Sequence, residues 1–136
     1  MHGIDTNVLV RYILQDDIKQ ARLATDFIEN EASLFFINGI VICELVWVLE
    51  TAYEYAREHI IIAIESILKT RQFCFDDPDI LWQALRGYKH DGADFADNYI
   101  GYLNHRHQCE YTVTFDKDAA RLKHFRQLSS VISLPA

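Results

Sequence analysis

Short apolar runs alternate with longer amphipathic segments along the chain, and this alternation constrains the fold more than any other feature. Runs of three or four residues suit buried strands, whereas the segments between them repeat apolar residues at helical spacing. Strands are expected at residues 3–4, 34–37, 73–75 and 111–114, with an edge strand at 131–134. Helices are expected at 6–15, 17–29, 40–53, 57–69, 78–88, 94–107 and 116–125. Strands that alternate with helices predict an α/β fold with a parallel sheet covered on both faces.

Two ranges need separate treatment. Residues 40–53 would also suit a strand, because they are rich in Val and Ile. Residues 89–92 are polar and end at a glycine, so a loop is expected there. One domain is expected over residues 1–136, since this length suits one core and is short for two.

Composition and charge restrict the classes of function. No apolar run reaches about 18 residues, so a membrane span is not expected. No basic region precedes an apolar N-terminal stretch, so a signal peptide is not expected either, and the protein is expected to be cytoplasmic. Thirteen Lys and Arg against 20 Asp and Glu leave a net charge of −7, which disfavours nucleic-acid binding by charge alone. An enzyme whose carboxylates hold a cation that meets a phosphate remains open. Cys43, Cys74 and Cys109 are widely spaced and are expected as small core side chains.

Acidic or polar residues follow almost every expected strand. Asp5 follows the first strand, Asn38 the second and Asp76 the third, and Asp116 comes shortly after the fourth. Sites in open parallel sheets form beyond the carboxyl ends of the strands, where successive strand-to-helix turns meet. These side chains are therefore expected at one edge of the sheet.

Glu44 is expected to be buried, because it stands in the apolar run from Ile40 to Leu49. An ionised carboxylate without a partner costs several kcal/mol to bury, so such residues pair, bind metal or take up a proton. Two interpretations remain open. Glu44 either forms a buried ion pair or lines a solvent cleft without a function, or its carboxylate points into a metal site. Asp5 likewise has an alternative role as the N-cap of the helix that follows it.

Asp94 and Asp97 lie three residues apart and fall on one face of the expected helix. Asp94 could be its N-cap and Asp97 its third residue, where the helix dipole favours an acid. Asn98 and Gly101 would extend this face as a polar, uncrowded strip. Asp116 could also be only a cap.

Carboxylates from four segments at one sheet edge would repel one another without a cation. Oxygen ligands without His or Cys suit Mg²⁺ or Mn²⁺ rather than zinc. Such a site can bind a phosphate, lower the pKa of bound water and stabilise the leaving oxygen. The residues themselves therefore predict metal-assisted hydrolysis of a phosphodiester.

Four motifs carry a resemblance to a known family. Asp5-Thr6-Asn7-Val8-Leu9-Val10 resembles the opening of PIN domains of the VapC toxin type, and Glu44-Leu45-Val46-Trp47-Val48-Leu49 resembles their central Glu motif. Ala93-Asp94-Phe95-Ala96-Asp97 with Tyr99-Ile100-Gly101 is similar to their third motif, and Thr114-Phe115-Asp116-Lys117-Asp118 to their fourth. The motifs occur in the family's order from residue 5 to 118. Asn98-Tyr99 stands where many relatives have small apolar residues.

The resemblance implies a three-layer α/β/α PIN-like fold with a central parallel sheet. It also implies a Mg²⁺- or Mn²⁺-dependent endoribonuclease, the toxin of a toxin–antitoxin pair, that commonly dimerises and binds a small antitoxin. By motif position the catalytic acids are Asp5, Glu44, Asp97 and Asp116, with Asp5, Asp97 and Asp116 as metal ligands and Asp94 as an accessory candidate. Whether Asp94 or Asp97, and Asp116 or Asp118, binds metal directly stays open. The matching polar support positions are Thr6, Asn7 and Thr114.

Two other classes of function compete. A phosphotransfer domain also uses acids at strand ends with Mg²⁺, but an aspartyl phosphatase needs a second Asp where this chain has Asn7. A non-catalytic PIN-like binding module would be expected to lose some acids, and this chain keeps a candidate at every motif. The RNA itself is not specified by these residues. Cations that could track its phosphates, or form an ordinary solvated helix face, are Lys117, Arg121, Lys123 and, beyond them, His124 and Arg126.

Overall fold

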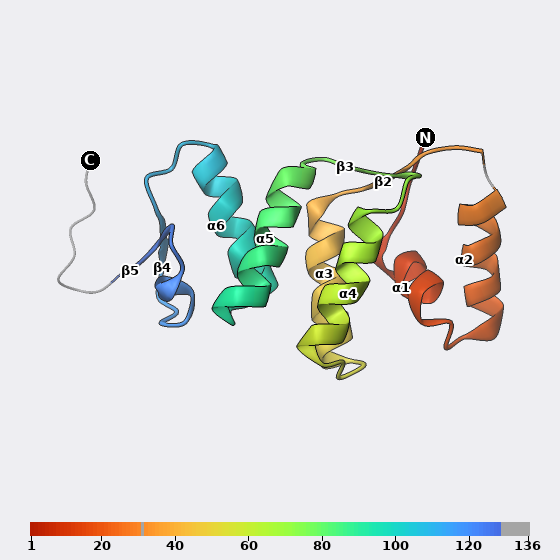
Figure 1. The fold of residues 1–136 in the computed structure, drawn as a ribbon, viewed down its shortest axis with the longest axis horizontal. Helices are drawn as coiled ribbons and strands as arrows, with labels where there is room; N and C mark the ends of the chain where they lie inside the picture. The colour runs from red at the N-terminus through yellow and green to blue at the C-terminus, as the bar shows by residue number, and fades with distance from the viewer. Residues whose placement is uncertain (31, 129–136) are drawn as a thin grey trace. The chain divides into compact units, whose positions relative to one another are not determined.

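A computed structural model describes residues 1–30 and 32–128 of the chain (Figure 1). The contacts between residues divide the chain into two compact units, Met1–Asp79 and Ile80–Ala136. The expected edge strand at 131–134 lies outside the described residues.

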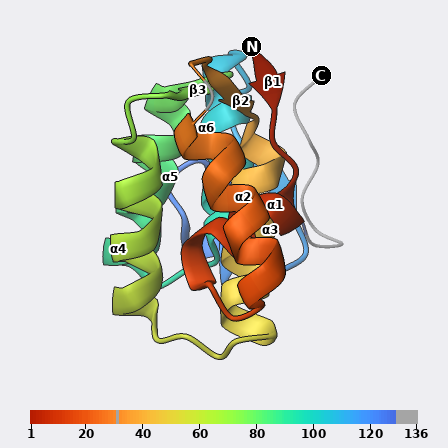
Figure 2. The same cartoon turned by 90° about the vertical axis from the view of Figure 1, so that its right-hand side faces the viewer.

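The first unit contains a three-stranded parallel sheet and four helices. Its elements in chain order are β1 (His2–Gly3), α1 (Thr6–Leu14), α2 (Ile18–Asn30), β2 (Phe35–Ile37), α3 (Gly39–Thr51), α4 (Arg57–Leu68) and β3 (Phe73–Phe75). The strand order is β1-β2-β3, with His2 opposite Phe35 and Phe35 opposite Phe73. Two helices separate each strand from the next, because parallel strands require a crossover connection. Figure 2 shows α2 lying beside α1, against which it packs.

The central strand β2 anchors the core of this unit. Phe35 and Ile37 are fully buried, and the Phe35 ring meets the rings of Phe27 and Phe73 edge-on at centroid distances of 5.3 and 6.5 Å. Each helix contributes one apolar face to the same core; its fully buried members include Leu9, Ile28, Leu45 and Ile60. Packing on both sides of β2 therefore fixes the carboxyl ends of the strands, where Asp5, Asn38 and Asp76 follow.

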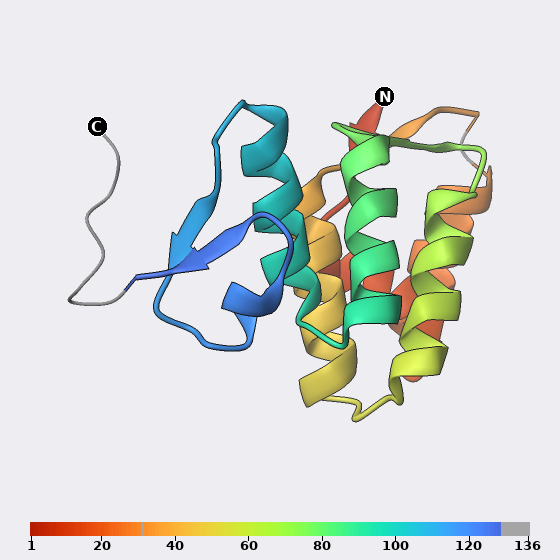
Figure 3. The ribbon, with the colours of Figure 1, turned by 60° about the vertical axis from the view of Figure 1, so that its left-hand side comes forward.

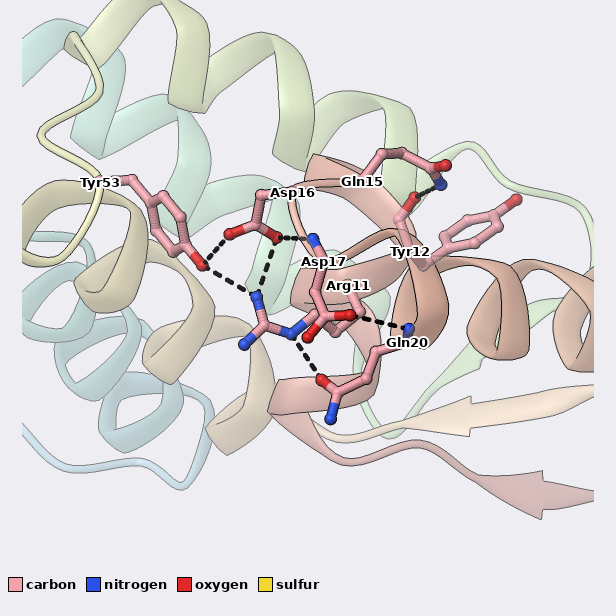
Figure 4. A network of polar contacts seen from close by, with 7 residues as sticks. All are labelled: Arg11, Tyr12, Gln15, Asp16, Asp17, Gln20 and Tyr53. Carbon is pink, nitrogen blue, oxygen red and sulfur yellow. Dashed lines mark hydrogen bonds and ion pairs between the residues drawn. The ribbon is translucent and has the colours of Figure 1, made fainter.

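A polar network joins the end of α1 to the end of α3 (Figure 4). Arg11 donates to Asp16 in a 2.8 Å ion pair, and the Tyr53 hydroxyl donates to the other Asp16 oxygen at 2.9 Å. The hydrogen bond from Tyr53 and the charge of Arg11 lower the pKa of Asp16. Arg11 also donates to Gln20 of α2 at 2.8 Å. The network ties the turn between α1 and α2 to the segment after α3, which helps to hold α1 in place.

The second unit contains most of α5, a further helix and a pair of parallel strands. Its elements are α5 (Pro78–Asp91), α6 (Phe95–Arg106), β4 (Thr112–Thr114), the short 3₁₀ helix η1 (Ala119–Arg121) and β5 (Phe125–Gln127). Val113 of β4 lies opposite Arg126 of β5. Figure 3 shows these two strands beside α6, against which β4 packs. The buried rings of Tyr88 and Phe95 join α5 to α6 edge-on at 6.0 Å.

The last helix expected at 116–125 is wrong. The chain instead forms a turn at Asp116–Asp118, the single turn η1 and then β5. Leu122 leaves helical geometry with ψ of 149°, and Phe125–Gln127 pairs with β4, so strand pairing prevails over weak helical periodicity. The expected loop at 89–92 is also wrong in part, because α5 continues to Asp91 and ends before Gly92, whose φ of +68° suits glycine.

The remaining expectations agree with the structure in most elements. Residues 40–53 form a helix, α3, and the described strands are parallel, with six α-helices among the described residues, consistent with the expected α/β PIN-like fold. The first strand is shifted by one residue to His2–Gly3. None of the three cysteines forms a disulfide, and none belongs to the buried core: Cys43 and Cys74 are half-buried and Cys109 is exposed. No helix among the described residues has the length and apolar character needed to cross a membrane.

Candidate active site

Asp5 stands between β1 and α1 and is the N-cap of α1. Its Oδ1 accepts a hydrogen bond of 2.7 Å from the backbone N–H of Thr6, as the alternative role for this residue predicts. The side chain is exposed, and a carboxylate has about four acceptor positions, so capping leaves capacity for a ligand. The cap fixes where this carboxylate stands.

Thr6 connects α1 to α3 through a side-chain hydrogen bond. Its buried hydroxyl donates to Glu44 Oε1 at 3.1 Å. Asp5, Thr6 and Glu44, predicted from two separate motifs, are therefore brought to one place in the first unit. The contact orients the Glu44 carboxylate beside the start of α1.

The expectation that Glu44 is buried is wrong. Its side chain is exposed, on the same face of α3 as Ile40 and Trp47, which are 68% and 63% exposed. The buried residues Val41, Leu45 and others occupy the opposite face of this helix. The apolar residues that flank Glu44 in sequence therefore do not surround its side chain. The hydrogen bond from Thr6, rather than a desolvated pocket, orients its carboxylate.

Two other polar residues near the strand ends serve local structure. Asp76 accepts a 3.0 Å hydrogen bond from the backbone of Gly39, and Asn38 caps α3 by accepting from Val41 at 3.0 Å. Asn7 lines a groove of about 540 Å³ between α1 and α2, together with Val8, Arg11 and residues of α2 that include Leu23 and Phe27. Asn7 thus lies at this groove, and its predicted role as polar support stays a prediction.

The second unit gathers acidic side chains around one cavity of about 470 Å³. Asp94 is the N-cap residue of α6, without a side-chain capping bond, and Asp97 is the third residue of that helix. The charged residues that line the cavity are Asp91, Asp94, Asp97, Asp116, Asp118 and Arg121. The cavity thus joins the third and fourth motifs.

Asp97 has the clearest electrostatic signature in this cavity. Burial raises its pKa above the usual 3.8, and the charges of Asp94 and Asp116 raise it further. The three carboxylates are therefore close enough to interact, and their repulsion in a partly desolvated setting favours a proton or a cation. This is the observation by which the acids fit a bound divalent metal, which oxygen donors suit.

The turn after β4 fixes Asp116. Its backbone N–H donates to Thr114 Oγ1 at 3.0 Å, and its Oδ1 accepts from the backbone of Asp118 at 2.8 Å. Thr114 thus holds the backbone of Asp116 in this turn, and its predicted role as polar support stays a prediction. Both aspartates line the cavity, but only Asp116 acts on the pKa of Asp97, which favours Asp116 as the partner of Asp97.

The predicted polar strip at Asn98 and Gly101 is wrong. Asn98 is buried, with 2% of its surface exposed, and donates to the Asp94 carbonyl at 3.0 Å. Gly101 lies against the ring of Phe125, where a methyl group would come within 2.5 Å of a ring carbon. Both residues pack α6 against its neighbours, Asn98 against Gly87 and Gly101 against Phe125, so neither offers a polar, uncrowded surface beside the acids.

The basic residues in and after the fourth motif do not form a helix face, and they divide into four settings. Arg121 lines the acidic cavity, and among the described residues it has no ion pair or side-chain hydrogen bond. Lys117 and Lys123 are exposed.

Arg126 lies 5.0 Å from the Tyr111 ring centroid and donates to its hydroxyl at 2.8 Å. The His124 ring stacks at 3.8 Å on that of His105, and burial, His105 and Lys123 lower its pKa.

The predicted site residues fall into two groups, one in each unit. Within residues 1–30 and 32–128, no three His, Cys, Asp or Glu side chains form a ready-made metal site. Asp91 was missed by the sequence analysis because it was placed in a loop rather than at the end of α5. An acid directly before a helix-ending glycine was the available signal.

The comparison with known proteins covers the part of the chain that contains the acidic motifs. The sequence model of the PIN domain matches residues 4–124, which include all four motifs. The chain is also 28% identical over 99 residues to a VapC ribonuclease of Aquifex aeolicus (strain VF5), an alignment that covers 71% of this chain and 73% of that protein. The chain therefore belongs to the PIN-domain family.

Proposed function

We propose that this protein is a metal-dependent endoribonuclease and the toxin of a toxin–antitoxin pair. The observation that carries the proposal is the cavity of the second unit, which gathers Asp94, Asp97 and Asp116 and where burial and the charges of Asp94 and Asp116 raise the pKa of Asp97. Membership of the PIN family and the distant similarity to a VapC ribonuclease support this chemistry over phosphotransfer. A candidate acid at every motif supports catalysis over binding alone.

Each residue has a proposed role in the reaction. Asp5, Asp97 and Asp116 would hold Mg²⁺ or Mn²⁺, with Asp94 as an accessory ligand. A metal held by these residues would lower the pKa of a water molecule and neutralise charge on the phosphate. Glu44, oriented by Thr6, accepts a proton. Arg121 binds the phosphate at the cavity wall, and Lys117 and Lys123 attract the RNA backbone.

The direct test is cleavage of single-stranded RNA by purified protein with Mg²⁺, with Mn²⁺ and with excess chelator. Cleavage is expected only with metal, and Asp5→Asn should lose it while keeping the cap of α1, because an amide oxygen also accepts from Thr6. Asp26→Asn removes an exposed carboxylate of α2 outside the motifs and is the matched control. Undiminished cleavage in chelator would refute the metal mechanism.

The proposal includes a protein partner. A small antitoxin, the product of a neighbouring gene, is expected to place Arg or Lys from an extended or helical tail into the acidic cavity and to exclude RNA. Its association should weaken as salt rises, because opposite charges steer it. Binding is measured by sedimentation, and inhibition by RNA cleavage, for the wild type and for Asp118→Asn. Sedimentation of the protein without its partner also tests the expected homodimer. A neighbouring protein that neither binds nor suppresses cleavage would contradict this part.

A further inference from the structure

Phe115 is the most exposed large apolar side chain among the described residues. Its exposed fraction is 78%, although it lies between Thr114 and Asp116 of the fourth motif. An exposed phenylalanine gains nothing from burial within the fold, and the three residues that follow it are all charged. The side chain is thus not explained by the packing of this unit.

The backbone on both sides of Phe115 is held. The Thr114 carbonyl accepts from the backbone of Leu128 at 2.7 Å, and the Asp116 N–H donates to Thr114 Oγ1 at 3.0 Å. The Asp116 carbonyl also accepts from the backbone of Ala120 at 3.0 Å. The ring therefore stands on a braced turn, which limits the conformational entropy that binding would cost.

The surroundings of this turn indicate what the ring meets. Asp116, which directly follows Phe115, and Arg121, the last residue of η1, both line the acidic cavity. Arg121 has no ion pair among the described residues. An exposed ring directly before a cavity-lining residue, and a cation without an ion pair at the same cavity, match a nucleotide, which combines a planar base with an anionic phosphate. A protein interface would require a broader apolar patch, whereas Asp116, Lys117 and Asp118 follow the ring directly.

We propose that Phe115 stacks on an unpaired base of the RNA next to the bond that is cut, while Arg121 binds the adjoining phosphate. The proposal rests on the proposed ribonuclease function and names the side chain that would hold an unpaired base of that substrate. Bases within a duplex are stacked on each other and offer no free face to a side chain.

The experiment uses short RNAs with 2-aminopurine at successive positions, in chelator so that the RNA stays intact. Stacking on Phe115 should quench the fluorescence at one position, and Phe115→Ala should remove the quenching and weaken binding about 10-fold. Phe115→Trp should preserve both, and Phe115→Leu should lose the quenching. Val113→Ala is the matched control, because Val113 is an exposed apolar residue of the neighbouring strand without an aromatic ring.

A second arm measures cleavage with metal. An RNA lacking the base at the quenched position should be cut equally by the wild type and by Phe115→Ala. The inference is overturned if Phe115→Ala behaves as Val113→Ala does in both arms, or if it changes only sedimentation, which would indicate a contact between copies. Wild-type protein that binds RNA but never cuts it would overturn the proposed function alone, and a protein that does not bind RNA would overturn both.

Discussion

Asp97→Asn is expected to reduce RNA cleavage at least about 100-fold and, at the same time, to make the metal-free protein more stable. The gain in stability follows from the cavity, where burial and the charges of Asp94 and Asp116 penalise ionised Asp97. Asparagine keeps the shape and removes the charge. The free energy of unfolding should rise by about 1 kcal/mol, which raises the melting temperature by about 3 °C.

The pH dependence of this gain has a defined sign. Because the folded pKa of Asp97 is raised, the folded state holds the proton more tightly than the unfolded chain does. The stability that this proton contributes is present below the usual pKa of 3.8 and is lost as the pH rises through the folded value. The difference between Asp97→Asn and wild type should therefore be small at the acid end and grow toward neutral pH, as measured by melting across that range.

Magnesium should narrow the difference between the two proteins. A ligand that binds only the folded state stabilises it by mass action, and the variant should bind Mg²⁺ more weakly. Asp26→Asn, with an exposed carboxylate on α2, should melt and respond to Mg²⁺ as the wild type does. If Mg²⁺ raised the melting temperature of wild type and Asp97→Asn equally, Asp97 would not be a metal ligand, and Asp94 would be favoured as the ligand.

Gly87→Ala is expected to destabilise the second unit by about 3 kcal/mol. Alanine normally favours a helix interior by about 1 kcal/mol, so the expected sign is opposite to helix propensity. The reason is the side chain of Asn98, because a methyl group on Gly87 would lie 2.7 Å from Asn98 Cγ. Asn98 is buried and bonded to the Asp94 carbonyl, so it has little room to move.

Urea unfolding of Gly87→Ala, Asn98→Ala and the double variant measures the effect. If the overlap causes the loss, the two changes should be strongly non-additive, since Asn98→Ala removes the atoms that the new methyl group meets. A Gly87→Ala protein as stable as the wild type would show that Asn98 can move aside freely.

Helical and strand periodicity predicted most elements correctly where the elements are long or deeply buried. It failed at residues 116–125, because the pairing of Phe125–Gln127 with β4 depends on a strand elsewhere in the chain. It also failed for the burial of Glu44, because successive residues of a helix point in different directions and an apolar sequence neighbour can lie on another face. The identity of the acids could be predicted from the motifs, but their surroundings could not.

The details of the cavity needed three dimensions. Asp91 enters it only because α5 continues to that residue, and Asn98 leaves the polar face because it fills the space above Gly87. The exposure of Phe115 likewise depends on how the turn after β4 is braced. None of these follows from residue type or spacing alone.

Asp5 joins a structural duty and a chemical one in a single side chain. One oxygen closes the first turn of α1, and the charge is what the proposed chemistry needs. The two duties tolerate different replacements: asparagine or serine preserves the first and removes the second, whereas alanine removes both. A folded form without the proposed activity is therefore a single substitution away, and under the proposed function such a form would bind the proposed antitoxin without cutting RNA.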